Sequence, residues 1–353
     1  MADTSRAYFE VKLQGRSVAA RVRSVTVEDH DRLIDEATVV LDDQGGEAAD
    51  VPVEGHVLLI ELGASDDHAV IFEGCVTRVR SESGGMGRRA TIVAYDRSYA
   101  LNREPHTRDL TPGLLSAVVR EVVGTQLPIG QVEPDSDHTY TAERPPPRQV
   151  GKTDWQYLQD LALAHGARCF VEYNEGRSQL YFVGERRLFQ AAALGKLRFC
   201  QGVRELLEFT YERIASGAAP QRTLTSEDPA TGAPAAAPAP EPPTPAPPAS
   251  SAPPPTTAPE SLRPRVATVG APSDPDLPAR AARRDPTREL GLFGRGMAVG
   301  TYKLRAKGKV TITGVAPWVE GDWYLRKVVH NFTADREGQV DRSTYVTRFE
   351  VTR

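Results

Sequence analysis

Hydrophobic and polar residues alternate along the first hundred residues in the period-2 pattern of half-buried strands. In residues 7–13, the apolar Phe9, Val11 and Leu13 alternate with Glu10 and Lys12. Further segments of this kind follow at residues 18–28, 37–42, 56–62, 69–80 and 89–96. Turn-forming clusters separate them and no helical pattern intervenes. The sequence therefore predicts an antiparallel sandwich or barrel rather than a doubly wound sheet.

The pattern then changes to a helical period. Thr111 and Pro112 predict the N-cap and the first position of a helix, and Gly124 predicts its end. Between them the apolar residues recur three and four positions apart, at Leu115, Val118, Val119 and Val122.

A second helix is predicted by a capping box, in which the side chains of Thr153 and Gln156 satisfy free backbone N–H groups. Gly166 ends this helix, and a β-hairpin with its turn at residues 174–176 follows. Strands return near the end of the chain, at residues 310–315, 322–332 and 343–352. In the last strand, Tyr345, Thr347, Phe349 and Val351 share one face.

One segment has a different composition from the rest. The chain has 28 prolines, thirteen of them between Pro229 and Pro259, and no Val, Ile, Leu, Met or aromatic residue occurs between Leu224 and Leu262. Such a tract does not bury enough apolar surface to offset the entropy of ordering it. We therefore predict a disordered, surface-exposed spacer. A ligand for a proline-binding domain is the alternative.

Together these patterns predict a mainly β protein with an α+β insertion. Two β-barrel units are linked by a small helical and hairpin domain and interrupted by the proline-rich insertion. The expected divisions are a first barrel at 1–105, a helix-helix-hairpin domain at 106–190, the start of a second barrel at 191–215, the insertion at 216–287 and the remainder of the second barrel at 288–353.

Composition argues against several classes of function. The 353 residues carry a formal net charge of -4, which argues against binding to nucleic acid through phosphate neutralisation. Three separated cysteines, Cys75, Cys169 and Cys200, form neither a disulfide framework nor a metal-ligand spacing. The N-terminus lacks the apolar core of a signal peptide, and no apolar run is long enough to span a bilayer. We expect a cytoplasmically made protein that does not insert into membranes.

The sequence contains no complete motif for nucleotide binding. Gly151-Lys152-Thr153 resembles the end of a phosphate-binding loop, but Pro146 stands where that loop needs glycine. Gly294 and Gly296 lack the dinucleotide-binding spacing and the βαβ context, and they more plausibly relieve crowding in a bent strand.

Motifs for catalysis and metal binding fail as well. None of the seven histidines lies within four residues of another, so no helical metal pair exists. The paired carboxylates Asp42-Asp43 and Asp66-Asp67 lie at expected turns, which favours solvated turn residues over a glycosidase pair. Cys169 lies in an apolar strand, which favours a buried structural thiol over a nucleophile. We expect no catalytic residue, no cofactor and no metal, and hence a protein that is not an enzyme.

Several segments, taken in order, resemble the phage late control gene D protein family, the baseplate hubs of contractile tails. The family is itself similar to the N-terminal half of VgrG spike proteins. The most specific segment is the helix Thr153 to Ala162 followed by Gly166. The other matching residues are Ile71-Phe72-Glu73-Gly74 with Val76, Ala94-Tyr95-Asp96 with Leu101 and Arg103, Gly300, Leu304, Gly308, Val310, Gly314-Val315, Gly321, Tyr324, Val328, His330 and Phe349-Glu350-Val351.

The resemblance implies a structural hub that forms a homotrimer. Each chain would contribute two similar barrels, so that three chains present a pseudo-sixfold face to the hexameric tail tube or its initiator protein. A threefold face would meet the trimeric spike, with baseplate wedge proteins as further neighbours. The protein would be a component of an assembled phage tail or injection particle.

Two departures from the family leave alternatives open. The proline-rich tract is an insertion, and no spike domain follows the second barrel in this sequence, so the resemblance implies a spike on a separate polypeptide. A spike-side or effector-carrying component that uses the tract as a tether is the first alternative. A tail-associated cell-wall hydrolase is the second, although no compact acid/base segment is inserted.

Overall fold

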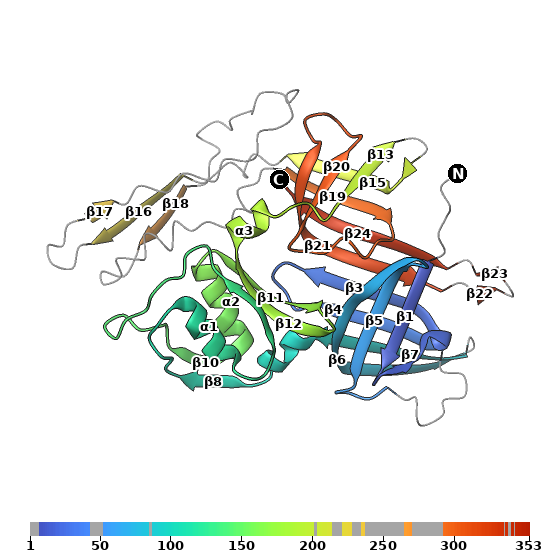
Figure 1. Ribbon diagram of the computed structural model, residues 1–353, viewed down its shortest axis with the longest axis horizontal. Coiled ribbons are helices and arrows are strands. Elements are labelled where there is room, and N and C mark those ends of the chain that lie inside the picture. The colour runs from blue at the N-terminus through green and yellow to red at the C-terminus, as the bar shows by residue number, and fades with distance from the viewer. Residues whose placement is uncertain are drawn as a thin grey trace.

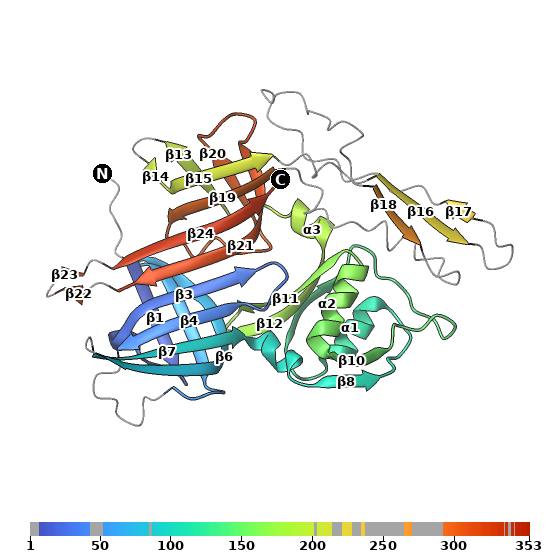
Figure 2. The same cartoon turned by 180° about the vertical axis from the view of Figure 1, so that it is seen from behind.

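A computed structural model describes residues 7–42, 52–84, 87–200, 203–213, 221–227, 234–236, 265–269, 292–334, 336–337, 340–341 and 343–353. Within these ranges the dominant element is one curled sheet of fourteen strands. Three separate hydrophobic cores lie against or beside it. Figures 1 and 2 show the curled sheet from its two sides, with the helices gathered beside it.

The first part of the sheet curls around an aliphatic core that includes Val25, Val39, Leu58, Ile60 and Ile92. The strict alternation of buried and less buried residues explains this curl, because each strand turns one face inward. Its elements are β1 (Ala7–Leu13), β2 (Arg16–Ser17), η1 (Ala19–Arg21), β3 (Val22–His30), β4 (Glu36–Asp42), β5 (Val57–Ala64), β6 (Asp67–Gly84) and β7 (Gly87–Asp96).

The middle of the chain forms a small α+β unit with its own core, in which Leu115, Leu158, Leu180 and Phe182 are fully buried. The hairpin of β11 and β12 is antiparallel, and β9 pairs with β12 in parallel. The elements are η3 (Arg97–Asn102), β8 (Pro105–Arg108), α1 (Leu115–Val123), β9 (Ile129–Glu133), β10 (Gln149–Thr153), α2 (Asp154–Ala164), β11 (Ala167–Asn174), β12 (Arg177–Gly184) and α3 (Glu185–Gln190).

The second part of the sheet curls around a core centred on Trp323, with Val310, Ile312, Leu325 and Phe349. Its longest strand, β21, has thirteen residues. The elements are β13 (Gly195–Cys200), β14 (Val203–Arg204), β15 (Leu206–Arg213), β19 (Leu292–Val299), β20 (Lys309–Thr313), β21 (Gly321–Thr333) and β24 (Thr344–Thr352), with the short pair β22 (Arg336–Glu337) and β23 (Val340–Asp341).

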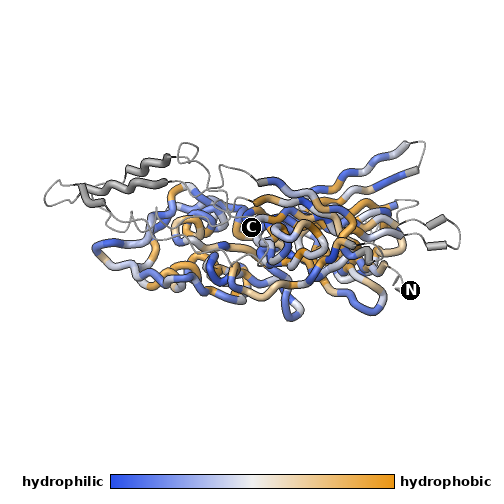
Figure 3. The backbone as a smooth tube through the Cα atoms, turned by 90° about the horizontal axis from the view of Figure 1, so that it is seen from above, coloured by the Kyte–Doolittle hydropathy of each residue, from blue (hydrophilic) through white to orange (hydrophobic). Residues whose placement is uncertain are grey.

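These elements confirm the predicted fold class, a mainly β chain with two barrel-like units and an α+β unit between them. One feature was not predicted. Strand β21 pairs with β24 on one side and with β3 on the other, so the two units form one continuous sheet. Figure 3, which views the molecule from above, shows hydrophobic stretches running through this body.

The predicted helices are both present, but one begins later than expected. The helix α1 begins at Leu115 with Leu114 as its N-cap, so the prediction of a cap at Thr111 is wrong. The reason is a distant residue, Asp137, whose carboxylate accepts hydrogen bonds from the backbone N–H of Ser116 at 2.9 Å and from its hydroxyl at 2.6 Å. The predicted capping box of α2 and the end of α1 at Gly124 are confirmed.

Three short strands lie within residues 216–287, the range predicted to be a disordered insertion. They are β16 (Gln221–Glu227), β17 (Pro234–Ala236) and β18 (Arg265–Val269). These strands pair only with one another, and β16 and β18 flank the stretch without large apolar residues. The remainder of that range lies outside the described residues. Among the described residues, none of the helices combines the length and the apolar composition that crossing a bilayer requires.

Candidate assembly face and the buried junction behind it

The continuous sheet presents one long face on which alternate residues point away from the cores. Figure 2 shows β19, β24, β21, β3, β4 and β7 side by side in this order, and no helix of the described chain lies in front of them. We call the outward residues of these six strands the assembly face. Because the sheet crosses both barrel-like units, this face is shared by them.

The middle of the assembly face carries no charge. Two rows of outward residues lie directly opposite one another across the strands, and we call them the neutral rows. The first row consists of Val299, Val346, Asn331, Thr26 and Thr38. The second row consists of Thr344, Thr333, Ser24, Val40 and Thr91. Thr26 and Asn331, which come from different units, are hydrogen-bonded at 3.3 Å.

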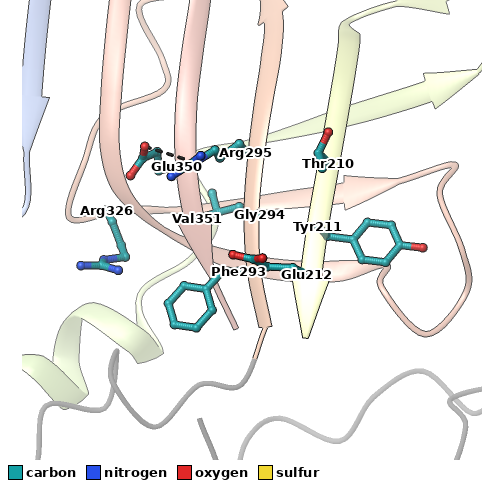
Figure 4. Close-up of a pocket in the computed structure, with 9 residues that line it drawn as sticks. All are labelled: Thr210, Tyr211, Glu212, Phe293, Gly294, Arg295, Arg326, Glu350 and Val351. Carbon is teal, nitrogen blue, oxygen red and sulfur yellow. Dashed lines mark ion pairs between the residues drawn. The ribbon is translucent and has the colours of Figure 1, made fainter. Parts of the chain in front are cut away.

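Charged residues border the neutral rows on both sides. Next to Val40 and Thr91, Asp42 lies opposite Arg89 and forms an ion pair with Arg23 at 2.6 Å. On the other side, Lys327 forms an ion pair with Glu28 at 2.6 Å across the β21–β3 boundary, and Arg295 pairs with Glu350 at 3.5 Å. At the end of this charged border lies a shallow depression of about 250 Å³. Figure 4 shows Arg295 facing Glu350 there, with Arg326 apart from that pair. The face thus has a neutral band between two charged margins.

Behind the sheet, a buried cluster of charged residues connects all three units. Lys307, from the loop before β20, is 4% exposed. Its Nζ lies 2.6 Å from Oδ1 of Asp29 on β3, 2.9 Å from Oε1 of Glu172 on β11 and 3.5 Å from Oδ2 of Asp35 in the β3–β4 loop. Arg305 binds the other oxygens, at 2.9 Å from Oδ2 of Asp29 and 2.5 Å from Oε2 of Glu172. We call this cluster the junction.

Electrostatics explains why these buried charges persist. Burial opposes ionisation of Asp29, but Lys307 and Arg305 outweigh it and hold the pKa of that carboxyl well below its ordinary value. Burial likewise opposes charge on Lys307, and the surrounding carboxylates Asp29, Asp35 and Glu172 outweigh it and raise its pKa. Ion pairs of this kind hold segments in fixed register more than they add stability.

The junction also resembles a cation site by its donors. Oxygens of Asp29, Asp35 and Glu172 lie within 4.8 Å of one another, a grouping that suits a hard metal ion. The ammonium group of Lys307 already lies among these three carboxylates. The residues present therefore fit an internal lysine counter-ion and leave no place for a metal.

Several of the residues that the sequence offers for chemistry have local roles in the fold. Thr153 caps α2, and Lys152 forms an ion pair with Asp160 at 2.6 Å. Two residues of the motif that resembles a nucleotide-binding loop therefore contact the helix that follows them. Cys169 is buried in β11, and burial raises the pKa of its thiol. Asp67 is not only a solvated turn residue, since it accepts hydrogen bonds from Tyr302 and Lys303 of the second unit at 2.6 Å each.

The surroundings of Gly294 and Gly296 can be compared with the predicted role of these glycines in relieving crowding. A Cβ atom at Gly296 would lie 2.3 Å from the Phe349 ring, and one at Gly294 would lie 2.8 Å from the Phe209 ring. The proposal that these glycines relieve crowding is confirmed. No two histidines lie within four residues of each other in the sequence, but the fold brings two of them together. The ring centroids of His138 and His165, 27 positions apart, are 5.5 Å from each other.

Sequence reasoning missed the junction. One signal was present, because Asp29 continues the inward series of Val25 and Val27 and places a carboxylate where the pattern requires an apolar residue. Nothing local marks Lys307, Arg305 or Glu172, which contact Asp29 and Asp35 only through tertiary structure.

The architecture can be compared with known proteins. No family model matches this sequence, and no curated protein matches it either. Solved structures match over the whole chain. A tail protein from Neisseria meningitidis MC58 aligns with a TM-score of 0.67 at 11% identity, covering 98% of this chain and 96% of that one.

The chain has the fold of phage tail proteins. A second example is the 43 kDa tail protein of prophage MuSo2 from Shewanella oneidensis, with a TM-score of 0.65, 10% identity and coverage of 99% and 98%. The E. coli c3393 protein, a type VI secretion component described as similar to T4 bacteriophage tail proteins, aligns at 0.58 and 10% identity, covering 97% of this chain and 76% of that one. The tail-protein fold agrees with the resemblance to the late control gene D family.

Proposed function

We propose that this chain is a structural baseplate hub of a phage tail or a phage-tail-like contractile injection system. The observation that carries the proposal is the end-to-end match to tail proteins, which covers nearly all of both chains. The role is one of assembly rather than catalysis, in keeping with the local structural roles of Lys152, Thr153 and Cys169. Fold alone does not specify function, so the assembly face supplies the second support.

In the proposed hub, three copies close into a ring by a heterologous interface. Each copy contributes two units whose outward strands already form one sheet through β21 and β3. Three such sheets would present six similar units to a hexameric tail tube, and the threefold opposite side would meet a trimeric spike. We propose that the assembly faces line the central passage, since the neutral rows leave a surface without charge for ions or polymers to bind.

The decisive experiment is imaging of the assembled particle. Three copies between tube and spike, with the neutral rows toward the axis, are expected. Six copies, or a position in the sheath or the tail fibres, would contradict the hub. A complementary variant, Thr38→Lys, places a charge on the neutral rows. It should leave the fold intact and reduce delivery of payload, whereas Leu163→Lys, which adds the same charge at an exposed position on α2, should not reduce delivery.

A spike-side role is the second candidate. The fold also matches the type VI secretion component and a Francisella PdpA-VgrG complex, the latter with a TM-score of 0.55 over 52% of that chain. The tract between β15 and β19 would then tether an effector. Pull-down of a fused or co-expressed effector that depends on residues 228–264 would support this role, and loss of the tract with full delivery would reject it.

A further inference from the structure

The buried charges in and beside the junction form two halves, which together include more acids than bases. The half beside the junction is balanced, since Arg168 and Arg32 lie against Asp31 and Glu185. In the other half, which is the junction with the neighbouring Asp96, the two cations Lys307 and Arg305 lie among four buried or half-buried acids. These acids are Asp29, Glu172, Asp35 and Asp96. If all of them were ionised, this half would carry two uncompensated negative charges in the interior, at a cost that buried groups normally avoid by keeping protons.

The four acids are held in different ways. Asp29 and Glu172 each contact both cations. Asp35 has Lys307 at 3.5 Å and accepts a hydrogen bond from the backbone N–H of His30 at 2.8 Å. The Asp96 carboxylate accepts backbone N–H groups, from Asp35 at 3.0 Å and from Ser98 at 2.7 Å. The excess negative charge therefore falls on Asp35 and Asp96.

We propose that Asp35 and Asp96 together retain a proton at neutral pH and form a latch between the units that weakens as the pH rises. Asp35 lies in the β3–β4 loop, and Asp96 begins η3 at the entrance to the middle unit. Their backbones are joined in both directions, because the N–H of each donates to the other residue. Lys307 of the second unit and Glu172 of the middle unit close the same site. The inference does not depend on the proposed hub function.

The groups that face the pair act in both directions, and burial is the largest cause for each carboxyl. Burial raises the pKa of Asp96 from 3.8 to about 6, although hydrogen bonds from Ser98 and the Asp35 backbone and the charge of Lys307 oppose this. Burial also raises the pKa of Asp35, which Lys307 lowers and Asp29, Asp96 and Glu172 raise. On β11, burial and, to a smaller extent, the negative charge of Asp96 raise the pKa of the Cys169 thiol. Two coupled groups titrate as a pair, so the proton belongs to both.

The sign of the effect follows from linkage. An unfolded aspartate has a pKa near 3.8, so above that value the folded state binds more protons than the unfolded one. The contribution of Asp96 to stability therefore falls as the pH rises from 3.8 to about 6. Asp35 extends the same decline to higher pH. Ionisation of Asp35 and Asp96 leaves uncompensated negative charge where the β3–β4 loop, η3 and the loop that carries Lys307 meet. These three segments should then separate from one another more often.

Infrared spectroscopy of the full-length protein in D₂O tests the proton directly. Exposed carboxyls are ionised at about pH 7, so a carboxylic-acid band there reports a buried protonated group. We expect this band in the wild type and a weaker band in Asp35→Asn and Asp96→Asn. It should be unchanged in Asp160→Asn, a half-exposed control on α2. A wild-type spectrum without the band overturns the proposal, whether or not the variants fold.

Thermal unfolding and hydrogen exchange test the latch. Relative to the wild type, the Tm of Asp96→Asn should rise as the buffer goes from about pH 4 to about pH 7. The Tm of Leu163→Ala, which removes no titratable group from α2, should keep a constant difference from the wild type. Exchange of amides in residues 30–36 and 97–102 of the wild type, corrected for intrinsic rates, should increase several-fold over about two pH units above neutrality. A pH-independent difference for Asp96→Asn, or unchanged corrected exchange, overturns the latch.

Discussion

At the scale of single residues, Lys307 combines a buried charge with an uncommon backbone conformation. Its ammonium group contacts carboxylates from β3, the β3–β4 loop and β11, and its backbone adopts a left-handed φ of 68°. Asparagine and glycine tolerate that conformation better than lysine does. The side chain therefore has to supply enough attraction to offset the strain.

Replacing Lys307 by methionine should destabilise the protein strongly. The substitution keeps the length of the side chain and removes the charge, so Asp29 and Glu172 lose their most buried partner. Breaking a buried ion pair on one side costs roughly 3–5 kcal/mol. Denaturant unfolding measures this loss. Lys303→Met, at an exposed pair with Asp67, is the matched control and should cost less than about 1 kcal/mol. Equal effects of the two variants would show that the junction is not the stabilising feature.

His330 should make the protein sensitive to acid. It lies on β21, 1% exposed, with its Nδ1 2.8 Å from the Tyr345 hydroxyl. Burial, aided by the charge of Arg305, lowers its pKa from 6.5 to about 3. The unfolded state therefore binds more protons below pH 6.5, and the contribution of His330 is lost as the pH falls from 6.5 towards 3.

The variant His330→Gln isolates this effect from the opposite trend of Asp96. The difference in unfolding free energy between wild type and variant should shrink by up to about 1.4 kcal/mol per pH unit below the ordinary histidine pKa. Denaturant titrations at several pH values measure it. Leu163→Ala, at an exposed residue of α2, removes no titratable group and should show no such change. A difference that stays constant with pH would mean that His330 titrates normally in the folded state.

At the scale of elements, local patterns predicted more than distant ones did. The strand alternation at residues 37–42 and the capping box at Thr153 involve neighbours in sequence, so both were predictable. The start of α1 was not, because Asp137 supplies the cap from 21 positions away from Ser116. The β21–β3 pairing joins Asn331 to Thr26, 305 positions apart, and no pattern along the chain encodes such a partner. The junction depends on four separate segments and was invisible for the same reason.

The glycines of β19 give a test at this scale. A Cβ atom at Gly296 would enter the Phe349 ring on the neighbouring strand β24. Gly296→Ala should therefore cost about 1–3 kcal/mol through overpacking. Gly195→Ala, at a strand glycine with no atom within 4 Å of the added carbon, is the control. Thermal unfolding compares them. A neutral Gly296→Ala variant would mean that the aromatic ring moves freely and that the glycine serves another purpose.

At the scale of the whole molecule, the proline-rich tract leaves and re-enters the fold at one point. Strands β15 and β19 are antiparallel neighbours, and Arg213 pairs directly with Leu292. Residues 214–291 thus replace what is topologically a hairpin turn. The small sheet of β16, β17 and β18 lies within this excursion and pairs with no strand outside it. Within the described residues of this range, no strand belongs to the fourteen-stranded sheet.

Replacing residues 214–291 by a two-residue Asn-Gly turn should leave the fold intact, since that turn suits an antiparallel pair such as Arg213 and Leu292. Shortening the loop lowers its closure entropy, a gain on the order of 3 kcal/mol at most. Tm and circular dichroism should match or exceed those of the wild type. A deletion extended to residues 208–297 removes the β15–β19 pairing and should abolish folding. If the short deletion also unfolds the protein, the tract is part of the barrel; if it folds but no longer delivers payload, the tract acts as a tether on an independent scaffold.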